Sequence, residues 1–364
     1  MSDKSKIEWT DATWNPIRGC SRVSEGCRNC YAERQAVRFT GNKRTTVAGT
    51  RSGPQPYSGL VVMQSDGPHW TGEVRFIEEH AGDPLHWRVP RRIFVNSMSD
   101  LFHEKVVQSW IDRIFAVMSL CPQHTFQILT KRADRMFSVV GKCNGRDLRR
   151  GVQDVLSRGG GAVAYGDIIH ELFDRWPLPN VHLGVSVEDQ KTADERIPSL
   201  LQTPAAVRWV SYEPALGPID SRRIHYDNTV EIDSLTGDHG VYRPLAGKSE
   251  RKVDWIVAGG ESGPGARPAH PDWFRSVRDQ CVAAGVPFFF KQWGEWGPIP
   301  SKPFKAAHYH WVRKDGLRHG MCEESSGDIC MALLHKKTAG RLLDGREWNE
   351  FPVLAARAQE ENAK

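Results

Sequence analysis

Short apolar runs recur through the middle of the chain, and polar residues follow each of them. The runs are RIFVN at 92–96, TFQILT at 125–130, VHLGVSV at 181–187, VRWVS at 207–211, WIVA at 255–258 and VPFFF at 286–290. Such nearly continuous apolar segments are typical of strands that are buried on both faces of a parallel sheet. A shorter segment at 9–16 predicts one further strand, so we expect six or seven strands.

Helical periodicity fills several of the intervals between these runs. Apolar residues recur at helical spacing from Val106 to Leu120, and a second helix is expected from about Pro271 to Ala284. Strands that alternate with helices define the α/β class. We expect a partial (β/α) barrel with insertions and a C-terminal extension, because the strand count falls short of eight. A doubly wound open sheet is the alternative.

The periodic pattern also predicts how the chain is divided. We expect a barrel domain at 1–293 and a C-terminal extension at 294–364 that packs on it. Turn-rich or polar stretches interrupt the barrel as insertions near 41–90, 141–178 and 219–250. Within them we expect a hairpin that pairs 59–63 with 73–76, and a helix at 167–175.

Polar side chains gather where the expected strands end. They are Ser97, Asp100, Lys131, Arg132, Ser186, Glu188, Tyr212, Glu213, Glu261, Lys291 and Gln292. In an α/β barrel the carboxyl ends of the strands form one rim, and the chemistry is found there. These residues are therefore the candidates for a site.

The most unusual stretch is TWNPIRGCSRVSEGCRNCYAE, which follows the first expected strand. It holds Cys20, Cys27 and Cys30 with the spacing C-x6-C-x2-C, and a helix is expected to begin at Tyr31. Three thiolates without an evident fourth partner suit a [4Fe-4S] cluster that keeps one non-protein ligand. Structural zinc, or thiols that are simply packed or redox-active, are the alternatives.

Composition and charge indicate in which cellular compartment we expect this protein. The 364 residues carry a net charge of +5, and no apolar run approaches the ~18 residues of a membrane span. The polar N-terminus lacks an apolar signal region, so we expect a soluble cytoplasmic protein without a membrane partner. Eight cysteines in such a chain do not indicate a disulfide framework. An auxiliary metal site at Cys322 and Cys330 stays open.

Several stretches together resemble one family. They are the cysteine stretch, FVNSMSDLFHE, TFQILTKR, HLGVSVED, RWVSYEPALGP, DWIVAGGESGPGARP, FFFKQWGEW and AGRLLDGREWNEFP. In this combination and order the chain is similar to the phage Gp37/Gp68 family, a radical-SAM-like group of three-cysteine proteins. The spacing departs from the commonest radical-SAM pattern, because six residues and not three separate Cys20 from Cys27.

The resemblance implies a cofactor and a reaction type. Cys20, Cys27 and Cys30 would hold three irons of a [4Fe-4S] cluster, and the fourth iron would bind S-adenosylmethionine. Reductive cleavage of that molecule gives a 5′-deoxyadenosyl radical, which abstracts hydrogen from a C–H bond. An electron donor such as flavodoxin or ferredoxin is implied.

The resemblance also suggests which residues contact S-adenosylmethionine. Ser97, Ser99 and Asp100 follow the second strand, where radical-SAM proteins contact the methionine amino group, although Asp100 is equally suited to capping the next helix. The other expected contacts are Ser186 with the methionine carboxylate, Glu188 with the ribose hydroxyls, and Tyr31.

Three further residues are expected to face the substrate. Lys131 is suited to neutralising a carboxylate or a phosphate, while Glu213 and Glu261 end later strands. For each glutamate a structural ion pair is the alternative. These three are the candidate catalytic residues.

The family resemblance implies DNA as the substrate. Its phage members are associated with thymidine hypermodification, in which 5-(Nα-glycyl)thymidine is isomerised to Cα-glycylthymidine. For a phage-encoded chain the location would be the host cytoplasm. The alternatives are a radical-SAM repair or modification enzyme of the photoproduct-lyase kind or acting on RNA, and a non-catalytic, zinc-stabilised DNA-binding protein.

Overall fold

The computed structural model describes most of the chain in two compact units. The described residues are 5–40, 55–143, 145–158, 176–226, 230–238, 251–299, 308–316 and 327–353. The first unit comprises residues 1–183 and 203–206, and the second comprises 184–202 and 207–364. The expected C-terminal extension at 294–364 belongs to the second unit.

Seven strands form the main sheet, and they correspond to the seven apolar runs. They are β1 (Ala12–Trp14), β6 (Arg92–Val95), β7 (Thr125–Thr130), β8 (Val181–Val187), β9 (Val207–Tyr212), β12 (Trp255–Gly259) and β13 (Phe288–Gln292). Their order in the sheet is β1-β6-β7-β8-β9-β12-β13. The α/β class is thus confirmed. Each strand lies beside the next along the chain without a reversal, which is compatible with a partial barrel and not with a doubly wound sheet.

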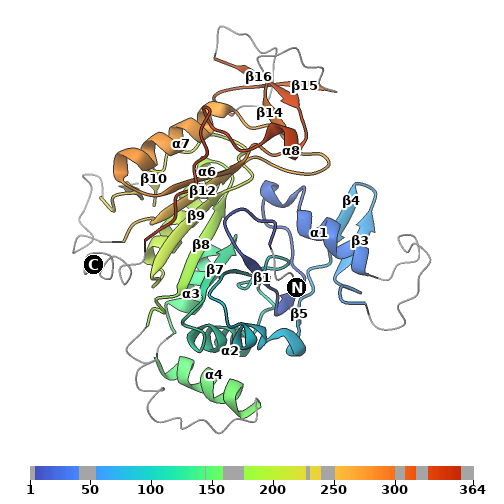
Figure 1. The fold of residues 1–364 in the computed structure, drawn as a ribbon, viewed down its shortest axis with the longest axis vertical. Helices are drawn as coiled ribbons and strands as arrows, with labels where there is room; N and C mark the ends of the chain where they lie inside the picture. The colour runs from blue at the N-terminus through green and yellow to red at the C-terminus, as the bar shows by residue number, and fades with distance from the viewer. Residues whose placement is uncertain are drawn as a thin grey trace. The chain divides into compact units, whose positions relative to one another are not determined.

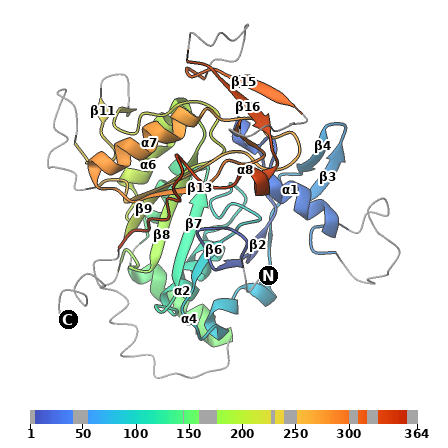
Figure 2. The same ribbon diagram turned by 45° about the horizontal axis from the view of Figure 1, so that its top comes forward.

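In the first unit, β1 pairs with β6 and β6 pairs with β7, both in parallel. The predicted helix between β6 and β7 is α2 (Gln108–Ser119), whose buried face includes Ile111 and Ile114. Helices α3 (Ala133–Val140) and α4 (Gly145–Arg158) follow β7. Helix α4 was not predicted; it packs along α2 (Figures 1 and 2). The helix expected at 167–175 lies outside the described residues.

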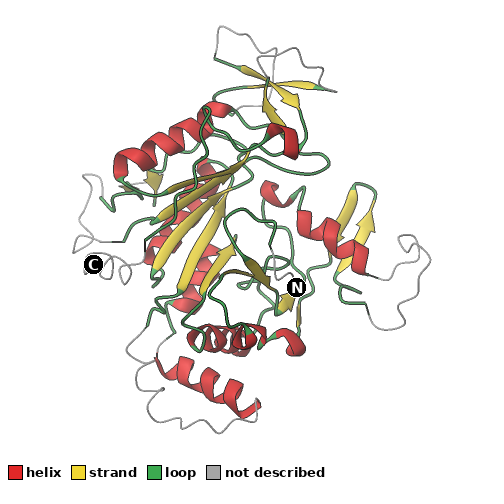
Figure 3. Ribbon diagram, in the orientation of Figure 1, coloured by secondary structure: helices red, strands yellow, loops and turns green. Residues whose placement is uncertain are grey.

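Small antiparallel pairs surround the cysteine stretch. Strand β2 (Ile17–Arg18) pairs with β5 (Arg75–Phe76), and β3 (Val61–Gln64) pairs with β4 (Gly67–Trp70). The predicted hairpin of 59–63 with 73–76 is therefore wrong. The turn residues Ser65 and Asp66, followed by Gly67 (φ +130°), close β3 onto β4 instead. Helix α1 (Tyr31–Ala36) lies against β4, as Figure 3 shows.

The described residues of the first unit also include four 3-10 turns. They are η1 (Glu25–Cys27), η2 (Val37–Phe39), η3 (Glu78–His80) and η4 (Asp83–His86). Each is only three or four residues long, so these segments turn the chain without adding a layer.

In the second unit, β9 pairs with β12 and β12 pairs with β13, again in parallel. Helix α6 (Gln190–Gln202) lies against β9, and α7 (Pro271–Ala284) lies against β12 and β13. The bounds of α7 match the prediction because local signals define them: the His270 side chain caps its start, and Gly285 ends it with φ +65°.

Short strands occupy the third predicted insertion and the tail. The insertion holds β10 (Ile224–His225) and β11 (Glu231–Ile232). The tail forms a sheet of β14 (Trp296–Pro298), β16 (Ile329–Leu333) and β15 (Tyr309–Val312), followed by α8 (Lys336–Ala339). The indole of Trp255 donates to the carbonyl of Glu350 at 2.9 Å, so the tail packs within the second unit.

The helices of the described residues are short. The longest, α4 and α7, have 14 residues each, and none is long and apolar enough to cross a membrane.

One histidine in β8 is buried without polar partners. His182 is 5% exposed, and neither of its ring nitrogens has a hydrogen-bond partner among the described residues. Burial lowers the pKa of His182 to about 4, because a charged imidazolium would lose its hydration. The side chain is therefore neutral in the folded protein at neutral pH.

This burial predicts acid sensitivity. The unfolded chain binds a proton at His182 near pH 6.5 and the folded chain only near pH 4, so stability falls as the pH drops through that window. We expect a loss of about 3 kcal/mol from this residue by pH 4. Urea unfolding between pH 7.5 and pH 4 measures it.

Two variants isolate the effect. His182→Leu should flatten the pH dependence, while His86→Gln, which alters an exposed histidine of the same unit, should retain it. A wild-type slope that persists in His182→Leu would show that another group causes the acid sensitivity.

Candidate functional site

The three cysteines lie in one loop of the first unit. The loop begins after β2 with Gly19, Cys27 ends η1, and Cys30 directly precedes α1. The backbone N–H of Cys30 donates to the carbonyl of Cys27 at 3.3 Å, so a tight turn brings these two residues together. All three cysteines are free and partly exposed.

A glycine directs the chain into this loop. Gly19 has φ +92° and forms a bridge with Ser99. A Cβ atom at this position would lie 2.1 Å from the carbonyl oxygen of Glu73. Glycine is therefore required here for both its conformation and its small size.

An ion pair with a buried carboxylate anchors the six-residue segment between Cys20 and Cys27. Arg22 donates to Glu33 with an Nη2–Oε2 distance of 2.6 Å, and the Glu33 side chain is 1% exposed. The same carboxylate accepts from the backbone N–H of Trp70 at 2.9 Å. The six-residue spacing is thus accommodated by a loop that is anchored to α1 and β4.

The three thiols influence one another. Burial raises the pKa of Cys20, Asp100 raises it further, and Cys27 and Cys30 add smaller effects, while Arg132 opposes them. Burial also raises the pKa of Cys30, with Cys27 again contributing. Negatively charged thiolates at these positions therefore need a positively charged group nearby.

The loop does not present a preformed site for a single ion. Within the part of the chain that the structure describes, no three His, Cys, Asp or Glu side chains are placed to share one metal ion. Tetrahedral zinc with bonds of about 2.3 Å would require sulfurs in close contact. A cluster holds each cysteine on a different iron, so its ligands lie further apart. The three free thiols are the residues that would hold such a cluster when it is bound.

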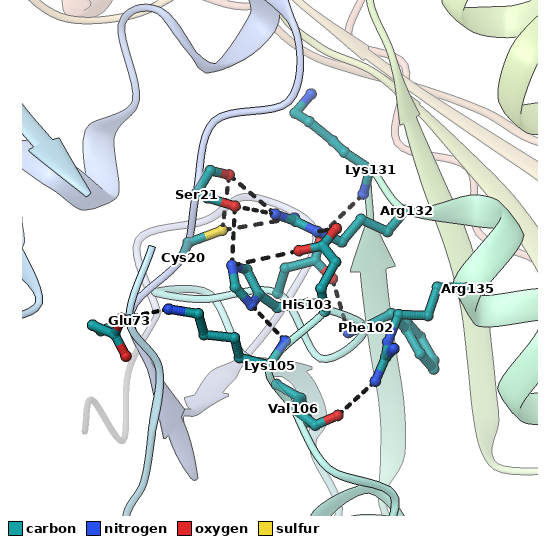
Figure 4. A network of polar contacts seen from close by, with 12 residues as sticks. Cys20, Ser21, Glu73, Phe102, His103, Lys105, Val106, Lys131, Arg132 and Arg135 are labelled. Atoms are coloured by element: carbon teal, nitrogen blue, oxygen red, sulfur yellow. Dashed lines mark hydrogen bonds and ion pairs between the residues drawn. The ribbon is translucent and has the colours of Figure 1, made fainter. Parts of the chain in front are cut away.

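A buried arginine reaches Cys20 from the end of β7. The Nη1 atom of Arg132 lies 3.8 Å from the Cys20 Sγ, and its Nη2 donates to the Ser21 Oγ at 2.7 Å. On its other side Arg132 pairs with Asp100 at 3.0 Å and with Glu104 at 2.8 Å. Figure 4 shows the guanidinium directed toward Cys20 and Ser21.

The predicted cofactor residue Asp100 lies in this network. Its Oδ1 accepts from the backbone N–H of Phe102 (2.9 Å) and the hydroxyl of Thr130 (2.7 Å). Its Oδ2 accepts from the backbone N–H of Lys131 (3.2 Å) and from Arg132. Four donors already surround the carboxylate, so an added ammonium group would have to replace one of them.

His103 is a site residue that the sequence reasoning missed. Its Nδ1 accepts from the backbone N–H of Lys105 at 3.2 Å, so its Nε2 carries the proton and donates to the Ser21 Oγ at 2.9 Å. Burial lowers the pKa of His103, and the charge of Arg132 lowers it further. The ring is therefore a neutral donor to Ser21 and not its general base. The only sequence signal was its place three residues after Asp100.

The other predicted residues of the first unit hold the loop in place. The hydroxyl of Ser99 donates to the carbonyl of Ile17 at 2.9 Å, and that of Ser97 donates to the side-chain oxygen of Asn15 at 3.1 Å. Tyr31 donates to the carbonyl of Ser97. The Lys131 side chain extends away from the His103 ring (Figure 4).

The remaining predicted residues belong to the second unit, and each has an internal partner. Glu188 is buried against Arg196 at 3.1 Å, and the hydroxyl of Ser186 donates to the backbone carbonyl of Glu213 at 3.1 Å. The other contacts are Glu213 with Lys291 at 2.8 Å and Glu261 with Arg267 at 2.6 Å. The structural ion pairs that were the alternative role for Glu213 and Glu261 are therefore present. Cys322, which with Cys330 was left open as an auxiliary metal site, lies outside the described residues.

Fold and site together define an α/β protein with a three-cysteine loop at the end of its first strands. The chain belongs to the family described as Protein of unknown function (DUF5131), whose model matches residues 4–352. No curated protein and no solved structure matches the chain.

The close approach at Gly19 generates a prediction. Gly19→Ala should cost both the positive-φ strain of about 1 kcal/mol and a clash of about 1–3 kcal/mol. Gly72→Ala is the matched control: Gly72 also has a positive φ (+80°), but its nearest neighbour would be Ser21 Cβ at 4.0 Å. Urea unfolding measures both variants. Equal losses would mean that the Glu73 carbonyl does not constrain the loop.

Proposed function

We propose that this protein is a radical S-adenosylmethionine enzyme whose [4Fe-4S] cluster is held by Cys20, Cys27 and Cys30. The observation that carries the proposal is the loop itself: three free cysteines lie in one anchored segment, with Arg132 against Cys20. When bound, such a cluster supplies the electron that cleaves S-adenosylmethionine and so provides a 5′-deoxyadenosyl radical. The protein contributes binding, orientation and the exclusion of water.

The residues around the loop have distinct roles in this proposal. Ser97, Ser99 and Asp100 follow β6 and surround the entry to the loop, where they are suited to orienting the methionine part of the cofactor. His103 holds Ser21 with a neutral N–H, and this keeps the loop backbone in place. Tyr31 ties the start of α1 to Ser97.

We propose Glu213 and Glu261 as substrate contacts. Glu213 directly follows β9, and Glu261 lies two residues after β12. Ser186, within β8, and Glu188, directly after it, keep their proposed contacts with the methionine carboxylate and the ribose hydroxyls. Glu213 and Lys291 form a partly exposed ion pair, which is suited to binding a polar group of the substrate. Lys131 of the first unit remains a candidate for neutralising a carboxylate or a phosphate.

As the particular reaction we propose isomerisation of 5-(Nα-glycyl)thymidine to Cα-glycylthymidine in DNA. The thymine methylene leaves the glycyl nitrogen and bonds to the α-carbon, while one hydrogen moves from that carbon to the nitrogen, so no net oxidation occurs. Exposed aromatic side chains support a nucleic-acid substrate: Tyr309 and Trp311 on β15 are 50% and 38% exposed. Bases stack on such rings.

The class of the enzyme has a direct test. Wild-type protein reconstituted anaerobically with iron and sulfide should be brown and should release 5′-deoxyadenosine from S-adenosylmethionine when reduced. Cys27→Ala should lose both properties, because one of three iron ligands is gone. Cys143→Ala, which removes a partly buried cysteine of the first unit outside the loop, is the control and should retain them. Colourless protein with stoichiometric zinc would support the zinc-stabilised alternative.

The substrate has a separate test. DNA rich in 5-(Nα-glycyl)thymidine should yield a nucleoside of unchanged mass but altered chromatographic retention after exposure to the active protein, because isomerisation conserves mass. Nucleoside mass spectrometry of the digested DNA measures this, with Cys27→Ala as the control. Unaltered nucleosides together with active cofactor cleavage would favour a repair reaction or an RNA substrate.

A further inference from the structure

An irregularity at the end of β13 turns two successive side chains toward one carboxylate. In a regular strand, Lys291 and Gln292 would point to opposite faces of the sheet. The register of β13 with β12 shifts directly before Gly259, which lies opposite Gln292. Such a bulge changes the direction of a side chain. Both residues consequently reach the Oε1 atom of Glu213, the Lys291 Nζ at 2.8 Å and the Gln292 Nε2 at 3.4 Å.

The ion pair of Glu213 with Lys291 does not use all the donors of the ammonium group. The Nζ atom bonds to the two carboxylate oxygens at 2.8 and 2.9 Å. An ammonium carries three N–H groups, so this pair leaves one of them for a further acceptor. The side chains of Glu213 and Lys291 are 18% and 15% exposed, so a ligand can reach them from the solvent.

The amide of Gln292 holds a buried oxygen without a partner. Gln292 is only 2% exposed, and its Nε2 donates to the Ser262 Oγ at 2.9 Å. Its Oε1 has no hydrogen-bond partner among the residues that the structure describes. Buried polar atoms of folded proteins are almost always hydrogen-bonded, so an unpaired one indicates that a donor is missing.

The carboxylate of Glu213 determines which end of the Gln292 amide faces it. With the amide turned over, its oxygen would lie 3.4 Å from the negatively charged Oε1 of Glu213. Two acceptors repel each other, so the NH2 end faces the carboxylate and the oxygen end faces away. Lys291 and Gln292 therefore offer one donor and one acceptor beside the same carboxylate.

We propose that Lys291 and Gln292 determine which base of a nucleic-acid substrate is bound. The Gln292 Oε1 accepts from a ring N–H of the base, and the remaining N–H of Lys291 donates to the carbonyl oxygen next to that ring nitrogen. Thymine, uracil and guanine carry an N–H beside a carbonyl on their pairing edge, whereas neutral adenine and cytosine have no ring N–H there. Enzymes that act on a flipped base read this edge by hydrogen bonds.

The charges of the site favour a neutral ligand group. Lys291 and Glu213 neutralise each other, so the pair has no net charge with which to hold a phosphate or an ammonium. An amide oxygen is itself a neutral acceptor and suits a neutral N–H. That the neutral ligand is a base rests on the proposed function; that it needs a donor beside an acceptor rests on the geometry.

The test measures how free nucleosides bind to the full-length, iron-free protein. Thymidine and N3-methylthymidine differ only at the ring nitrogen, which has a hydrogen in one and a methyl group in the other. Wild-type protein should bind thymidine about tenfold more tightly, because the methylated base leaves the Gln292 oxygen unpaired. Ligand-detected NMR titrations measure the two dissociation constants.

Substitution of Gln292 should remove this preference. Gln292→Met keeps a side chain of similar length but has no amide oxygen, so it should bind the two nucleosides alike. Lys291→Met should weaken the binding of both by a similar factor and keep their ratio, because both retain the carbonyl oxygen. A purely structural role of Gln292 would change the affinities without changing their ratio.

A matched control checks for general effects of replacing a glutamine in the second unit. Gln202 ends α6, and its Nε2 donates to the carbonyl of Pro198 at 3.2 Å. Gln202→Met should retain the wild-type ratio of the two dissociation constants. Should Gln292→Met fail to fold, Gln292→Leu tests the same loss.

The outcomes separate this inference from the proposed function. A preference for thymidine that disappears only on substitution of Gln292 supports the inference. A preference that persists in Gln292→Met overturns it, because the methyl group is then excluded by shape. Wild-type protein that binds both nucleosides alike, or neither, also overturns it and assigns the buried oxygen to an ordered water.

Cofactor cleavage by reconstituted protein is scored independently. Wild-type protein that discriminates between the nucleosides but releases no 5′-deoxyadenosine would overturn the proposed reaction class and keep the base site. Cofactor cleavage without discrimination would overturn the base site alone.

Discussion

The cysteine loop depends on one buried ion pair, that of Arg132 with Asp100. A buried guanidinium needs charged and hydrogen-bonding partners, because an unpaired charge in the interior costs about 3–5 kcal/mol. Arg132 meets this need with Asp100, Glu104 and the two oxygens of Ser21. These partners come from segments that follow different strands of the first unit. The need to pair one charge therefore holds those segments together and places the guanidinium beside Cys20.

Parallel pairing explains why these segments meet. Strands β1, β6 and β7 run side by side in the same direction, so the residues that follow them emerge at one edge of the sheet. In the second unit, β9, β12 and β13 also run parallel to one another, so the residues that follow them emerge at one edge of the sheet. There the residues at the strand ends are joined directly: Gln292 donates to Ser262 at 2.9 Å, and Lys291 bonds to both carboxylate oxygens of Glu213.

The carboxylates at the strand ends are already paired within the protein. Asp100, Glu188, Glu213 and Glu261 each accept from a cation of their own unit. Such pairs hold side-chain positions, and a ligand that takes over a carboxylate must first displace its partner. The thiols differ in this respect: burial and the charge of Asp100 raise the pKa of Cys20, while Arg132, which lies beside its sulfur, opposes them.

The amino-acid sequence by itself determined the elements that rest on local signals. Continuous apolar runs located the strands of the main sheet, and helical periodicity located α2 and α7. The spacing of Cys20, Cys27 and Cys30 located the loop. Only the tertiary structure decided which partners these residues take: β5 pairs with β2, four donors surround Asp100, and Arg132 reaches a sulfur 112 positions away. Apolar periodicity and helix caps act over a few residues, whereas the partner of a buried charge depends on which strand ends the sheet brings together.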